Sequence, residues 1–178
     1  MPWNRPASDT PFGFRPYGPV LRVRPYLKDA SAAAIYPGDV LIPEADGGVA
    51  VAGVSATNTL GVAAEYSAAS TAKNDFMVYD HPDQLFYVQD DGDTTAMSET
   101  EIFLNVDMIT TTGDTATFQS LHEIDSSSAA TTVGLACKVL GLHEMEGRSF
   151  ATTTGQQRKW IVQFNAHFYR DVVGQTGV

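Results

Sequence analysis

The sequence predicts an all-β protein: a single β-barrel or β-sandwich domain of about eight short strands, with an extended N-terminal arm and at most one or two short helices. Three observations lead to this prediction. Short runs of alternating apolar and polar residues recur between clusters of Gly, Pro and Asp. Only 18% of the 178 residues are charged, which is a weak indication of a β-rich structural protein. Six of the nine prolines fall in residues 1–27, where they disfavour helix. We therefore divide the chain into an arm (1–27), a body (28–171) and a tail (172–178).

The arm combines its prolines with aromatic and basic residues. Aromatic side chains at this density usually bury against a surface, so we expect an arm that docks on a partner instead of a flexible leader. The expected anchors are Trp3, Phe12, Phe14 and Tyr17, with Arg5 and Arg15 pairing with acidic groups of that partner. Residues 18–24 are predicted to add a first edge strand. Deleting residues 1–18 is expected to leave a folded body that no longer binds.

Charge is distributed unevenly along the chain. The net charge is −10. Residues 1–28 contain five basic residues and one acidic residue (+4), so the remainder carries −14. An acidic body disfavours nucleic acid, whose affinity comes largely from phosphate contacts. The basic arm favours an acidic partner, including a neighbouring copy of the same protein.

The first part of the body reads as short strands. Residues 40–42 and 49–53 form a predicted hairpin around the turn at 45–48. Residues 60–66 are predicted to form a strand with one buried side. Residues 76–79 and 85–89 are predicted to pair as a hairpin, because Asp80-His81-Pro82-Asp83 is typical of a chain reversal. Asp90-Asp91-Gly92-Asp93 is interpreted as a solvated turn, in preference to a calcium loop.

The second part of the body begins with the one helical signal. Ser98 and Glu101 match a capping box, which predicts one or two helical turns. Residues 110–132 are interpreted as a long surface excursion that holds one short element. Residues 133–140 and 160–168 alternate as two closing strands, and Gly141 predicts a bulge.

The chain shows no motif of a chemical site. His81, His122, His143 and His167 stand alone in different segments, and no spacing typical of a nucleophile, phosphate loop or zinc site occurs. The single cysteine, Cys137, excludes an intramolecular disulfide and reads as a small buried hydrophobe. We therefore expect no catalytic residues, no metal and no cofactor.

No apolar run approaches the roughly 20 residues that span a bilayer, and the N-terminus lacks the apolar core of a signal peptide. We expect a soluble protein made in a cytoplasm, without membrane contact. A carbohydrate-binding or hydrolytic β domain remains an alternative, with Tyr79, Tyr87, Asp90 and Asp91 as its candidate residues.

Four stretches carry a resemblance to a known group of proteins. They are Tyr36-Pro37-Gly38-Asp39-Val40, then LGVAAEYSAAST at 60–71, YDHPDQLFYVQDD at 79–91, and the strand at 160–168. In these stretches the chain resembles the head decoration, or cement, proteins of tailed bacteriophages.

That resemblance implies a β-rich virion protein, synthesised in the cytoplasm of a bacterial host, that binds the outside of the capsid in many copies and stabilises it. The implied partners are the major capsid protein and neighbouring copies, with a dimer or trimer on the shell. A tail, neck or fibre-base component of the virion would have the same composition and remains an alternative.

Overall fold

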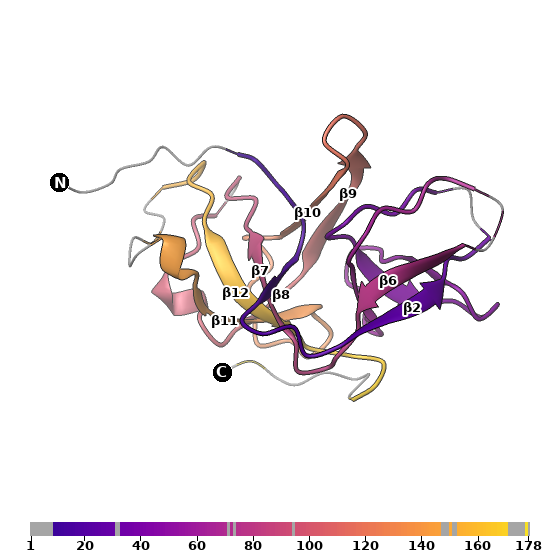
Figure 1. The fold of residues 1–178 in the computed structure, drawn as a ribbon. Helices are drawn as coiled ribbons and strands as arrows, with labels where there is room; N and C mark the ends of the chain where they lie inside the picture. Colours follow the sequence, from indigo (N-terminus) through magenta and orange to yellow (C-terminus); the bar gives the residue numbers. More distant parts are fainter. Residues whose placement is uncertain are drawn as a thin grey trace.

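Two five-stranded antiparallel sheets form the frame of the protein in a computed structural model (Figure 1). The structure describes residues 9–30, 33–70, 72, 74–93, 95–146, 150, 153–170 and 177. Sheet A has the strand order β1 (Arg15–Tyr17), β7 (Leu85–Gln89), β12 (Lys159–Phe164), β11 (Cys137–Leu142) and β8 (Asn105–Val106). The fold is therefore all-β, as the sequence predicts.

Sheet B closes on itself. Its strand order is β2 (Val23–Leu27), β6 (Asp75–Tyr79), β5 (Gly61–Ala63), β3 (Val40–Pro43) and β4 (Val49–Val51). A parallel bridge joins Lys28, directly after β2, to Val49 at the start of β4. The amide of Asp29 donates to the carbonyl of Val49 at 2.8 Å. These contacts join the two outer strands at one end, so sheet B closes into a small ring there while β2 itself remains an edge strand.

A two-stranded sheet projects from this frame. Strands β9 (Met108–Asp114) and β10 (Gln119–Ile124) form a hairpin whose loop extends beyond both sheets in Figure 1. The segment 110–132 does project from the sheets, as the sequence predicts, but the prediction of one short element within it is wrong, because the segment forms most of a two-stranded hairpin. The abundant Thr and Ser of this segment do not distinguish a strand from a loop, because exposed threonines are common in solvated sheets as well as in loops. Two strands were therefore missed.

The helical content of the described residues is two single 3₁₀ turns, η1 (Glu99–Glu101) and η2 (Glu144–Glu146). The predicted capping box at η1 is confirmed. The Ser98 side chain accepts from the backbone of the turn, and Glu101 Oε2 accepts from the Ser98 amide at 2.6 Å. The bulge predicted near Gly141 is also confirmed, since the pairing of β11 with β12 shifts register between Val139 and Gly141.

One hydrophobic core joins the two sheets. Sheet A contributes its inner face and sheet B one of its faces, in a single cluster that includes Val40, Val62, Phe86, Val88, Trp160 and Val162. The other face of sheet B buries a second cluster, which includes Ile35, Leu41, Leu60, Phe76 and Val78. Sheet B is thus covered on both sides, which explains why β5 is buried along its whole length instead of on one side only.

The chain crosses from sheet B to sheet A at Asp80. Strands β6 and β7 belong to different sheets, so the predicted hairpin between residues 76–79 and 85–89 is wrong. Asp80 is fully buried, and its carboxylate accepts from Arg22 Nε at 2.6 Å, Arg24 Nε at 2.6 Å and the Tyr26 hydroxyl at 2.5 Å. The turn residues correctly predicted a bend, but they do not determine which strand lies next to the chain after it.

The N-terminal residues from Asp9 onward are part of the body, which corrects the boundary at residue 27. β1 pairs with β7 and β2 pairs with β6, each at the edge of its sheet. The predicted edge strand is therefore present, but at Val23–Leu27 instead of 18–24. Pro16 and Pro25 lie in these strands, in agreement with the rule that proline occurs in outer strands.

The truncation at residue 18 would remove β1 and Phe14, so it is no longer expected to leave an intact body. Both closing strands are also shorter than predicted, since β11 begins at Cys137 and β12 ends at Phe164.

Candidate interaction surface

Four rings lie together on the outer face of sheet A, at its β1 edge. The ring of Phe12 lies 5.6 Å from that of Tyr87, which in turn lies 4.7 Å from the ring of His143. The ring of Tyr17 packs edge-on to His143 at 5.6 Å. We call Phe12, Tyr17, Tyr87 and His143 the aromatic face. Each is partly exposed.

Strand alternation accounts for this arrangement. In β7 the side chains of Phe86 and Val88 are 1% and 0% exposed and point into the core, so Tyr87 between them points outward. Arg15 is the register partner of Tyr87, and Tyr17 is the partner of Leu85. Antiparallel pairing therefore places Arg15 and Tyr17 on the same outer face as Tyr87.

Cations and one carboxylate border the aromatic face. Lys159 Nζ lies 6.0 Å from the centre of the Phe12 ring, the outer limit for a cation–π contact. The Tyr17 hydroxyl donates to Glu144 Oε1. That hydrogen bond raises the pKa of Tyr17 and lowers the pKa of Glu144. The face thus combines apolar rings, two basic side chains and a fixed acceptor, a composition typical of protein–protein contacts.

The structure brings together two of the predicted anchors and one of the predicted charged partners, and it separates a third anchor from them. Phe12, Arg15 and Tyr17 lie on or beside the aromatic face. Phe14 is 0% exposed and packs with Phe86 and Phe164 in the core, so its assignment as a partner anchor is wrong. Phe14 and Arg15 are consecutive, so their side chains point to opposite sides of the strand. This alternation is hard to recognise in the sequence because prolines interrupt the segment.

Trp3 and Arg5 lie outside the described residues. His143 was missed as a member of this surface because it follows a strand from a distant part of the sequence. The sequence predicts Tyr87 only as part of a glycan site, although its alternation with Phe86 and Val88 indicates an outward-facing position.

The residues proposed for a carbohydrate site do not form one. Tyr79 lies in sheet B and packs against the shared core, whereas Tyr87 is on the outside of sheet A. Asp90 is fully buried, where its carboxylate accepts from the Arg158 amide at 2.9 Å and from Trp160 Nε1 at 2.7 Å. Burial raises the pKa of Asp90 to about 6. Asp90 therefore holds β12 in place, and the interpretation of this segment as a solvated turn is wrong.

Two buried polar groups connect sheet B to β10. The amide of Val40 donates to His122 Nδ1 at 3.2 Å, and His122 Nε2 lies 3.4 Å from Asp39 Oδ1. Burial lowers the pKa of His122 to about 4 and raises that of Asp39 to about 6. The imidazole is therefore neutral near pH 7, and its remaining N–H faces Asp39. His122 holds the backbone of Val40 against β10, so its role is structural.

The carboxyl group of Glu123, which contacts Gln89 at the end of β7, gives a prediction about how stability depends on pH. Burial raises its pKa to about 7 although Gln89 Nε2 donates to its carboxylate at 2.9 Å, and the charges of Asp9, Asp91 and Asp90 raise it further. A carboxyl whose pKa is raised on folding stabilises the protein below its unfolded pKa of about 4.5, and this contribution is lost as the pH rises through about 7. At pH 8 the charged form costs stability.

We therefore expect Glu123→Gln to raise the melting temperature at pH 8 by about 2–4 °C, because the neutral amide avoids a cost of about 1 kcal/mol at this half-buried position. The difference from the unmodified protein should disappear by about pH 4.5. Glu44→Gln, in the exposed turn between β3 and β4, is the matched control and should change nothing at either pH. A lower melting temperature for Glu123→Gln at pH 8 would contradict the assignment.

Comparisons of the chain with protein-family models, curated proteins and solved structures returned no match. Within the part of the chain that the structure describes, no three His, Cys, Asp or Glu side chains come together as a metal site. No helix in that part is long and apolar enough to cross a membrane.

Proposed function

We propose that this protein is a structural component of a bacteriophage virion. It binds the outside of the capsid in many copies and stabilises the shell, and its N-terminal segment reaches neighbouring subunits. The observation that carries the proposal is the aromatic face, a preformed group of rings bordered by Arg15 and Lys159 on a chain of net charge −10.

The position of this face supports a contact with a large, flat partner. It lies on the outer side of a sheet whose inner side is fully packed, so binding requires no opening of the core. Rigid aromatic side chains bury large areas with little loss of conformational entropy. Rings that already pack against one another lose even less conformational entropy, which favours tight binding by a small surface.

Charge supports an orientation on the shell. The basic residues that flank the aromatic face suit an acidic patch on the capsid or on an adjacent copy. The rest of the chain is strongly acidic, and an acidic surface directed outward would keep particles apart in solution.

The direct test is cosedimentation of the purified protein with capsids that lack it. We expect saturation at hundreds of copies per shell, and decorated shells that withstand heating better than bare ones. Saturation at about a dozen copies would favour a tail, neck or fibre-base component instead. No binding would contradict a virion role on the capsid.

Phe12→Ala tests the aromatic face directly. Phe12 belongs to the face and contacts both Tyr87 and Lys159. We expect its removal to weaken capsid binding tenfold or more, because truncating a central interface aromatic typically costs about 2 kcal/mol. Phe118→Ala is the matched control, since Phe118 is 51% exposed at the tip of the β9–β10 hairpin, away from the aromatic face. Equal loss of binding in both variants would reject this surface.

A further inference from the structure

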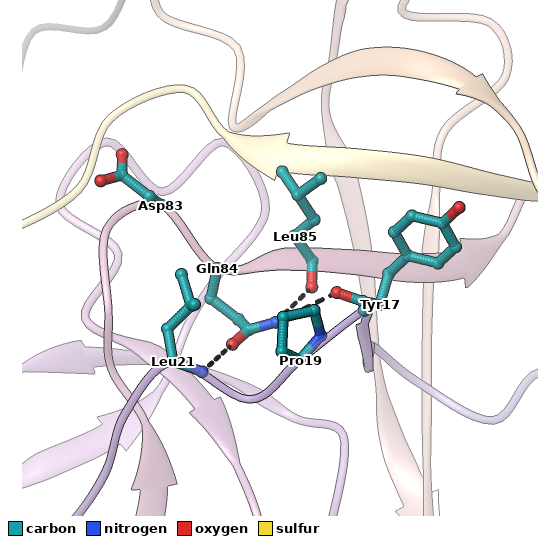
Figure 2. A pocket seen from close by; sticks show the side chains of 7 residues that line it. Tyr17, Pro19, Leu21, Asp83, Gln84 and Leu85 are labelled. Carbon is teal, nitrogen blue, oxygen red and sulfur yellow. Dashed lines mark hydrogen bonds between the residues drawn. The ribbon is translucent and has the colours of Figure 1, made fainter.

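A groove lies between the β1–β2 connection and the crossover from β6 to β7. One wall is Tyr17, Gly18, Pro19 and Leu21, and the other is Asp83, Gln84 and Leu85 (Figure 2). The groove has a volume of about 280 Å³. Apolar surface remains uncovered beside it, because Val20 and Leu21 are 50% and 48% exposed.

The groove is rigid because Gln84 connects its two walls. Gln84 is 1% exposed, and its Oε1 accepts from the Leu21 amide at 2.9 Å. Its Nε2 donates to the carbonyls of Leu85 at 2.9 Å and Tyr17 at 3.3 Å, as Figure 2 shows. The amide side chain is thus fully used in fixing the groove, which leaves a preorganised and mainly apolar surface for an occupant.

The dimensions favour one or two side chains as the occupant. Sites for drug-sized ligands and cofactors occupy roughly 300–1,000 Å³, so this groove is at or below their lower limit. Grooves lined by tyrosine and other apolar side chains are the usual receptors for extended, proline-rich segments. The chain contains such a segment in residues 1–8, where Trp3 lies between Pro2 and Pro6.

The direction of β1 favours another copy as the source of the occupant. β1 runs antiparallel to β7, so Tyr17 lies at Leu85 while the preceding residues run toward Gln89. There, Gln89 Nε2 donates to Asp9 Oδ1 at 3.1 Å. Residues 1–8 therefore join the described chain roughly 13 Å away from the groove, measured along β7. A chain would have to reverse direction to place Trp3 in its own groove, whereas a neighbour has no such restriction.

Charge is consistent with this contact. Residues 1–8 carry Arg5 and no acidic residue, and the groove has Asp83 on its rim with a side chain that is 62% exposed. Asp83 already pairs with Arg170 Nη1 at 2.8 Å, but this contact is exposed, and such pairs contribute little stability.

We propose that the groove formed by Tyr17, Pro19, Leu21 and Leu85 binds Trp3 of a second copy of this chain. The inference rests on the part of the proposed function in which the N-terminal segment reaches a neighbouring subunit. It specifies the receptor, the inserted side chain and the identity of the partner.

Cross-linking between singly substituted chains tests this contact. Cys137 is the only native cysteine and is fully buried, so introduced thiols can be followed on a low background. One chain carries Asn4→Cys, next to Trp3, and the other carries Val20→Cys, at the groove. After mixing at about 1 mM, comparable to the effective concentration of tethered neighbours, an added oxidant should produce heterodimers at least tenfold above control. The control pairs Asn4→Cys with Val54→Cys, since Val54 lies in another turn and is at least as accessible as Val20, at 63% against 50%.

Three further results would decide the matter. Adding Trp3→Ala to the Asn4→Cys chain, or Leu21→Glu to the Val20→Cys chain, should reduce the heterodimer to the control level without lowering the melting temperature by more than a few degrees. Absence of the heterodimer both in solution and on decorated particles would overturn the proposal. An intrachain link in a dilute Asn4→Cys/Val20→Cys double variant would show that Trp3 binds its own groove and would also overturn it.

These outcomes are separable from the capsid test. Heterodimers without capsid binding would reject the proposed function and keep the groove contact. Capsid binding without heterodimers would keep the capsid role and reject the groove contact.

Discussion

Replacing Asp80 with asparagine should lower the melting temperature by about 6–12 °C, corresponding to a loss of about 3 kcal/mol. Asp80 is fully buried where the chain passes from sheet B to sheet A, and it is the shared acceptor for Arg22, Arg24 and Tyr26. The amide would retain the shape but offer one acceptor oxygen and no charge to two guanidinium groups. The loss is below that of a fully enclosed ion pair, because the arginine side chains are 34% and 42% exposed and water can solvate them.

The effect should depend on pH. Burial alone would raise the pKa of Asp80, but the hydrogen bonds from Tyr26, Arg22 and Arg24 together hold it below its ordinary value. A carboxyl whose pKa is lowered on folding stabilises the protein above the unfolded value of about 3.8, and this contribution is lost as the pH falls below it. The difference between Asp80→Asn and the unmodified protein should therefore be constant from pH 6 to 8 and shrink below about pH 4.

Asp83→Asn is the matched control for this variant. It removes an arginine-paired carboxylate from the same crossover, but that carboxylate is exposed, so the expected change is within about 0.5 kcal/mol. Thermal unfolding followed by circular dichroism measures both variants. Equal melting temperatures for the two would contradict the role given to Asp80.

The second large effect is expected for Phe14→Ala. The Phe14 ring is 0% exposed, and its centre lies 5.7 Å from that of Phe164 and 6.5 Å from that of Phe86. Removing a buried phenylalanine costs about 3–5 kcal/mol through lost transfer energy and the cavity that remains. Natural domains are stable by only about 5–15 kcal/mol, so a large part of the stability should disappear.

Phe12→Ala provides the comparison, since the two residues are separated by one glycine and differ in direction. Phe12 is partly exposed on the outer face, so we expect its removal to cost about 1 kcal/mol of stability together with the loss of capsid binding described above. Phe14→Ala should show the opposite result, with low stability and normal binding by the molecules that remain folded. Denaturant unfolding and cosedimentation measure both variants. A larger loss of stability for Phe12→Ala than for Phe14→Ala, or a larger loss of binding for Phe14→Ala, would contradict these assignments.

Local chemistry explains which parts of the fold could be predicted. The β3–β4 hairpin, the capping box at Ser98 and the bulge at Gly141 depend on a few consecutive residues, and all three are confirmed. Errors arose where a distant segment decides the outcome. The sequence around Asp80 encodes a bend, yet the pairing of β7 with β12 and β1 takes that strand out of the sheet that holds β6.

The candidate surface shows the same division. Proline and aromatic content predicted that residues 1–27 pack against a surface. Within that segment, strand alternation distinguishes the outward Tyr17 from the inward Phe14. The composition did not reveal that sheet A of the same chain covers one side of this segment. His143 could not be found from local sequence, because only the register of sheet A brings it next to Tyr17 and Tyr87.

The pairing of β1 with β7 has a consequence for synthesis of the chain on the ribosome. Every strand of sheet B lies within residues 23–79, so the ring has all its strands before β7 is translated. β1 emerges first but has no partner until residues 85–89 follow, and Phe14 stays uncovered during this interval. An unpaired strand with an exposed aromatic residue is a site for aggregation. Pro11, Pro16 and Pro19 limit this danger, because they withhold amide donors from any foreign strand that could pair there before β7 arrives.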